Sequence, residues 1–169
     1  MLTLWKVQNV CRCRLSSKSN FDNTGYRGTS IMAVGFEVGY YWYQIGNGDF
    51  LHSFFSTIAV NLEDENWGIR FPIIMNELYK GKIEPEHIDT AIEELKNIKN
   101  ELKCFSVDKV VWDIEDRSKR PPWGDNISDD ISNLSDCYIT SDGEDFITIF
   151  MHALIKAKEL SKSINIKVI

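Results

Sequence analysis

The chain has 169 residues, of which 43% are hydrophobic and 26% are charged, and its formal net charge is −6. This length and composition predict one globular domain with a sizeable core. No apolar run is long enough to cross a bilayer, and no secretory signal is expected at the start.

Residues 1–31 differ from the rest of the chain in charge and pattern. They are basic, with Asp22 as their single acidic residue. The stretches S-S-K-S-N and D-N-T-G are typical of solvated, turn-rich chain. A regular pattern begins at Met32. We therefore expect residues 1–31 to be a disordered tail or an extension upstream of a misplaced start codon, and residues 32–169 to form the folded domain.

The first half of this domain predicts a β-rich start followed by helices. Residues 34–45 are rich in aromatic and β-branched side chains, which favours one or two strands. Residues 46–49 form a turn in which Asp49 is a candidate N-cap, and residues 50–62 carry an apolar stripe at helical spacing. Asn66-Trp67-Gly68 should break that helix. A second helix is expected over about residues 72–80, ending at Gly81.

The second half predicts two more helices and further strands. Pro85 lies in the first turn of a helix with one apolar face through Ile98. Residues 109–115 and 136–140 are expected to be strands. Residues 141–144, S-D-G-E, fit a capping box that opens the last helix, and residues 164–169 alternate like a strand. The sequence thus predicts a single α+β domain, a small and mostly antiparallel sheet with about four helices packed on it.

Most catalytic and cofactor motifs are missing from the sequence. The three histidines fall on different predicted helices without metal-ligand spacing, and no nucleophile elbow or phosphate-binding loop is complete. The four cysteines, Cys11, Cys13, Cys104 and Cys137, lack paired spacing, which fits a reduced, cytoplasmic protein. We expect no metal, no cofactor and no catalytic residue.

One enzymatic alternative stays open. Asp113 and Glu115 lie at the end of a predicted strand with Lys119 shortly after, which resembles the parts of a metal-dependent nuclease site. The lysine falls in a loop, however, and not in the alternating E-x-K position. A strand whose polar edge faces water explains these residues better.

The segment after this strand points to binding. Pro121-Pro122 stiffens a loop that presents Trp123, and residues 121–155 contain seven acidic residues and no lysine or arginine. Such a run repels nucleic acid and attracts basic protein surfaces. Trp123 either anchors a protein interface that is surrounded by charged residues or packs over the protein's own core.

Three stretches carry a resemblance to a known family. They are Y-W-Y-Q-I-G-N-G-D-F-L-H-S-F-F-S-T-I (41–58), W-G-I-R-F-P-I-I-M-N-E-L-Y-K-G (67–81), and V-V-W-D-I-E-D (110–116) with P-P-W-G-D-N-I-S (121–128). With them the chain resembles the bacterial immunity proteins of polymorphic toxin systems, in particular the immunity protein 70 family. The resemblance covers nearly all of residues 32–169 and none of residues 1–31.

The resemblance implies a non-catalytic inhibitor that binds the C-terminal domain of a cognate toxin in the cytoplasm of the producing cell. An acidic surface suits a basic toxin. The expected protein-binding residues are Trp123 and Trp67 as anchors, with Asp125, Asp129 and Asp130 steering the encounter. We expect no nucleic-acid or membrane partner. A homo-oligomer, the metal nuclease above and a structural or adaptor domain are left open as alternatives.

Overall fold

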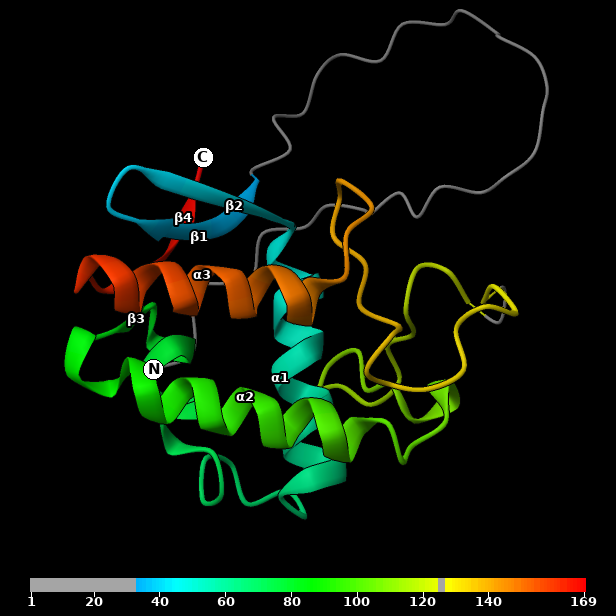
Figure 1. Cartoon of the computed structure of the whole chain (residues 1–169). Helices are drawn as coiled ribbons and strands as arrows, with labels where there is room; N and C mark the ends of the chain where they lie inside the picture. Colours follow the sequence, from blue (N-terminus) through cyan, green and yellow to red (C-terminus); the bar gives the residue numbers. More distant parts are fainter. Residues whose placement is uncertain (1–32, 125–126) are drawn as a thin grey trace, which may run out of the picture.

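The computed structural model of the chain describes residues 33–124 and 127–169 (Figure 1). Within them, four antiparallel strands form one sheet in the order β2-β1-β4-β3. The strands are β1 (Val34–Val38), β2 (Tyr41–Gly46), β3 (Lys82–Ile83) and β4 (Ile164–Val168). Three α-helices, α1 (Gly48–Leu62), α2 (Ile88–Leu102) and α3 (Phe146–Leu160), pack with the sheet. The α+β prediction is confirmed.

The sheet buries one face against the helices. Val34, Phe36 and Val38 alternate along β1 and are buried, as expected for a strand with one covered face. α3 lies between the sheet and α2, and α1 runs across α3 and α2 (Figure 1). On the other face, the indole of Trp42 lies over Gly35, where an added Cβ would clash with the ring. A glycine is therefore needed at position 35 to let the ring approach the strand this closely.

Aromatic rings fill the centre of the core. α3 brings Phe146 and Phe150 against Phe36 of β1, and α1 contributes Phe50 and Phe54.

The predicted N-cap of α1, Asp49, is wrong. Asn47 caps the helix through a 2.8 Å bond from the Phe50 amide to its side-chain oxygen, and Asp49 lies in the first helical turn. An N-cap side chain must precede the helix to reach its free amides, and Asn47 has that position.

Two buried carboxylates shape the segment between α1 and α2. α1 ends at Leu62, so the predicted break before residues 66–68 is confirmed. The Glu63 carboxylate then accepts the backbone amides of Gly68, Arg70 and Phe71 at 2.7 to 3.0 Å. Glu94 of α2 accepts those of the next turn, beginning at Ile73. The Glu94 bonds replace the helical partners that the first amides of a helix lack, and the Glu63 bonds hold the turns that precede it.

The predicted helix over residues 72–80 is helical but not α-helical. A π-turn, η1 (Ile73–Glu77), leads into a 3-10 turn, η2 (Leu78–Lys80), which ends at the left-handed Gly81 as predicted. The predicted third helix also begins with a 3-10 turn, η3 (Pro85–His87), before α2.

The expected strands at residues 109–115 and 136–140 are wrong. Within the described part of the segment between α2 and α3, the chain forms only the 3-10 turn η4 (Val107–Lys109) and an isolated bridge between Ile139 and Asp145. The capping box at residues 141–144 is wrong too. Asp145 caps α3, with its carboxylate accepting the amides of Ile147 and Thr148.

The predictions for residues 1–31, including Cys11 and Cys13, lie outside the described residues. Cys104 and Cys137 are free thiols. No helix in the described ranges has both the length and the apolar character that crossing a membrane requires.

Candidate functional site

The segment between α2 and α3 is fastened to α1 by hydroxyl groups. Ser53, Ser56 and Thr57 lie on the face of α1 toward residues 111–114. Ser53 Oγ donates to the Val111 carbonyl at 3.0 Å, Thr57 Oγ1 accepts the Val111 amide at 2.9 Å, and Ser56 Oγ accepts the Ile114 amide at 3.2 Å. These bonds satisfy backbone groups that a sheet would otherwise pair, which explains why no strand forms here.

Tyr138 reinforces this attachment from the other end of the segment. Its side chain is fully buried, and its hydroxyl lies 2.6 Å from Thr57 Oγ1 and 3.1 Å from the Ser53 carbonyl. Burial raises the pKa of the Tyr138 phenol, so it stays protonated and available as a donor. The irregular segment is thus held in one position beside α1.

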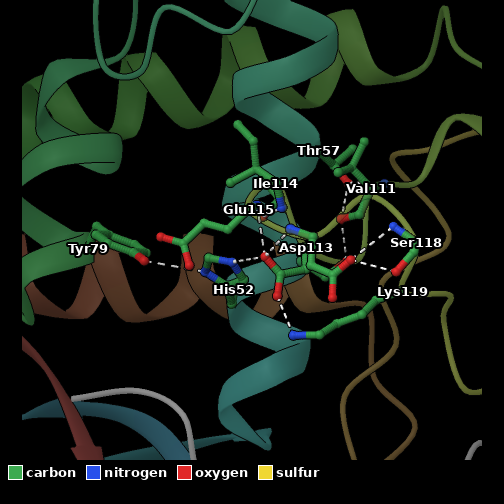
Figure 2. Close-up of polar contacts among 12 residues, drawn as sticks. His52, Thr57, Tyr79, Val111, Asp113, Ile114, Glu115, Ser118 and Lys119 are labelled. Carbon is green, nitrogen blue, oxygen red and sulfur yellow. Dashed lines mark hydrogen bonds and ion pairs between the residues drawn. The ribbon is translucent and has the colours of Figure 1, made fainter. Parts of the chain in front are cut away.

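Asp113 is the centre of a polar cluster at this junction (Figure 2). Only 7% of the residue is exposed. Its Oδ1 accepts the Glu115 amide at 2.9 Å and lies 3.4 Å from His52 Nε2, and its Oδ2 accepts Lys119 Nζ at 2.6 Å. His52 Nδ1 lies 3.3 Å from the Tyr79 hydroxyl. A chain of polar contacts therefore runs from Lys119 to Tyr79.

The cluster favours an ionised Asp113. Burial raises its pKa, but the hydrogen bonds from Lys119 and the Glu115 amide, with the charges of His52 and Lys119, outweigh burial and lower the pKa to about 2. The neighbouring Asp49 has the opposite shift. Burial raises its pKa, and the charge of Asp113 adds to this effect.

These contacts differ from those expected of the metal-dependent nuclease alternative. The Asp113 carboxylate is already occupied by protein donors, and Lys119 bonds directly to it, where it would compete with a cation. Glu115 does not share a strand face with Asp113, because the chain turns at Asp113. Among the residues that the structure describes, no group of three or more His, Cys, Asp or Glu is placed to hold a metal ion.

A groove of about 300 Å³ opens beside the cluster. Its walls include His52, Trp67, Met75, Tyr79, Lys80 and Glu115. Trp67 is half-buried and fixed. Its Nε1–H donates to the Met75 carbonyl at 2.8 Å, and its ring meets Tyr79 edge-on at 4.8 Å. The groove therefore has aromatic walls held in place before any ligand arrives.

The other sequence-predicted binding residues lie elsewhere. Trp123 is half-buried and packs edge-on against Trp112, with ring centroids 5.4 Å apart. Asp129 and Asp130 are exposed. Asp125 lies outside the described residues. Trp67 and Trp123 thus belong to separate aromatic groups, and whether any of these residues binds a partner stays a prediction.

His52, Tyr79 and Glu115 were missed as members of one site. Their sequence separations carry no motif, since the site depends on the segment after α2 folding back on α1. One local signal existed: His52, Ser53, Ser56 and Thr57 place polar groups along an otherwise apolar helix. Such a pattern indicates that the helix has a polar neighbour.

The comparison with family models decides the family. The model described as immunity protein 70 matches residues 36–166, most of the chain. The chain belongs to this family. No significant match is found among curated proteins or among solved structures. The matched range includes the polar cluster, the groove and the segment that carries Trp123.

Proposed function

We propose that this protein binds and neutralises a cognate toxin domain in the bacterium that produces both. The observation that carries the proposal is membership of the immunity protein 70 family over residues 36–166. An immunity protein needs a stable surface and no turnover. A rigid core with a long irregular segment fixed beside it suits that task, because recognition residues commonly lie on loops positioned by a scaffold.

The charge of the surface supports a basic partner. Asp129, Asp130, Asp142 and Glu144 are exposed, and within the described ranges none of their side chains forms an ion pair. Unpaired carboxylates that face solvent raise the association rate with a positively charged protein. The proposal includes the C-terminal toxin domain as that protein and the producer's cytoplasm as the compartment. Trp67 and Trp123 are the proposed anchors.

Co-expression in a bacterial host tests the proposal. The toxin domain encoded beside this gene is induced alone and together with the full chain, and surviving colonies are counted. We expect the chain to restore growth, and an unrelated acidic protein of similar size to give no rescue. Growth arrest that persists despite soluble, expressed chain would overturn the proposal.

A biochemical assay separates binding from catalysis. Purified chain is incubated with DNA and RNA in Mg²⁺, with Asp113→Ala as the matched variant. We expect no cleavage that depends on Asp113. Cleavage lost in Asp113→Ala would instead support the nuclease alternative.

A further inference from the structure

The groove beside α1 carries one acidic and one basic side chain that are free to meet a ligand. Glu115 and Lys80 both line it, and in the part of the chain that the structure describes neither forms an ion pair. Figure 2 shows the Glu115 carboxylate on the side of Asp113 that faces Tyr79 and His52. A carboxylate at an aromatic groove is an arrangement suited to binding a cation.

We infer that this groove receives an arginine or lysine side chain of the toxin, with Glu115 as its counter-ion. The inference rests on the proposed function and specifies the chemistry of the contact. The aliphatic stem of such a side chain would pack on Trp67 and Tyr79, which are partly exposed in the groove, and its charged head would reach Glu115.

The aromatic walls suit a cationic occupant electrostatically. The faces of Trp67 and Tyr79 carry partial negative charge and attract guanidinium or ammonium groups. The bond from Trp67 to the Met75 carbonyl and the edge-on contact with Tyr79 hold these rings in place. Binding therefore costs little additional ordering of the groove.

The charges that act on Tyr79 favour a cation over an anion at this end of the groove. Burial raises the pKa of the Tyr79 phenol, and the negative charges of Glu115 and Asp113 raise it further. Lys119 is already bonded to Asp113, so it does not neutralise Glu115. An anion in the groove would face the Glu115 carboxylate. A purely apolar side chain would desolvate Glu115 without giving it a partner, which is unfavourable.

Removing the negative charge of the groove in one variant and its positive charge in another tests the inference on the complex with the toxin domain. The affinity of the full chain for the toxin domain is measured for Glu115→Gln, Lys80→Gln and, as a charge control outside the groove, Glu86→Gln. We expect Glu115→Gln to weaken binding about tenfold and Lys80→Gln to strengthen it, because Lys80 repels the incoming cation. Unchanged affinity in Glu115→Gln, or weaker binding in Lys80→Gln, would overturn the inference.

A second measurement uses the chain alone. Amide and indole NMR signals are followed during titration with n-propylguanidinium and, separately, with the neutral n-propylurea. We expect guanidinium to shift the Trp67 and Tyr79 signals more than urea does, and Glu115→Gln to remove the difference. Equal shifts from the two probes would overturn the cation assignment. A guanidinium-specific shift without any binding to the toxin would instead overturn the proposed function and leave the groove's preference intact.

Discussion

Three carboxylates in the described part of the chain are buried, and each is bonded to backbone amides. Glu63, Glu94 and Asp113 are between 3% and 7% exposed. A buried charge is costly unless hydrogen bonds replace its hydration. Glu63 and Asp113 meet that requirement where the chain has no regular structure, and Glu94 meets it at the first amides of η1, which lack helical partners.

Glu63→Gln should reveal this role. The glutamine side chain would keep one acceptor oxygen but place an NH₂ group against a backbone N–H, leaving buried donors unsatisfied. We expect the free energy of unfolding to fall by about 2 kcal/mol, measured by urea denaturation. Glu65→Gln is the matched control. It should change the stability little, because the Glu65 carboxylate is exposed and its 3.4 Å contact with the Arg117 guanidinium is a surface ion pair, which contributes little to stability. Equal stability of the two variants would contradict the role assigned to Glu63.

Asp113 should make stability depend on pH in the acid range. Its folded pKa of about 2 lies below its ordinary value of 3.8. The stabilisation is therefore complete above about pH 4 and is lost as pH falls toward 2. We expect Asp113→Asn to lower the free energy of unfolding at neutral pH by at most roughly 2 kcal/mol, an upper limit because the Lys119 partner is partly exposed.

Thermal melts of the wild type and Asp113→Asn between pH 7 and pH 2 measure this effect. The difference between the two proteins should shrink as the pH falls. The exposed Asp142→Asn serves as the control. A difference that is constant over the whole range would show that Asp113 contributes by packing and not by charge.

At the scale of elements, the attachment of the irregular segment to α1 determines the site. The hydroxyls of Ser53, Ser56 and Thr57 bind backbone groups of residues 111–114, and Tyr138 binds the same helix. The cluster at Asp113 and the groove both depend on this packing, because they combine residues of α1 with residues of the segment.

Tyr138→Phe tests the attachment directly. Removing the buried hydroxyl takes away the donor to Thr57 Oγ1, and we expect a loss of about 1–2 kcal/mol in stability. The Val111 amide, bonded to Thr57, should exchange its hydrogen faster. Hydrogen exchange followed by NMR measures this, with the fully exposed Tyr40→Phe as the control. Unchanged protection of Val111 would show that the segment is held by other contacts.

The same packing explains which elements could be predicted from sequence. β1, β2, β4 and the three α-helices have apolar side chains at the period of their structure, and the sequence predicts them. Residues 109–115 are apolar enough for a strand, but their amides bond to side-chain hydroxyls far away in the chain. Trp67 could be singled out from sequence as a binding residue. Its groove could not, since His52, Tyr79 and Glu115 meet only in the folded protein.

At the scale of the whole molecule, one aromatic ring is the clearest candidate for a partner contact outside the groove. Trp123 packs on Trp112 alone among the described aromatic residues. We expect Trp123→Ala to reduce the affinity for the toxin domain by about 2 kcal/mol with a small change in melting temperature. Calorimetric titration and thermal melts measure the two effects. Intact neutralisation together with a lower melting temperature would mean that Trp123 supports the fold.

The exposed acids should act on the rate of encounter. For the double variant Asp129→Asn and Asp130→Asn, we expect slower association with the toxin, unchanged dissociation, and a difference that vanishes at high salt. Stopped-flow kinetics at two ionic strengths measure this. An effect confined to dissociation would place these residues in direct contact with the partner.

The segment between α2 and α3 has a consequence for how this family can diversify. It carries Trp123 and the acids, yet the sheet and the helical core need few of its backbone bonds. Irregular surface chain tolerates insertions and substitutions at low cost. Provided that Val111, Asp113 and Tyr138 keep their places against α1 and Leu134 keeps its place in the core, the exposed positions of the segment can change in charge. Under the proposed function, such changes would adapt the binding surface to a changed toxin without requiring a new fold.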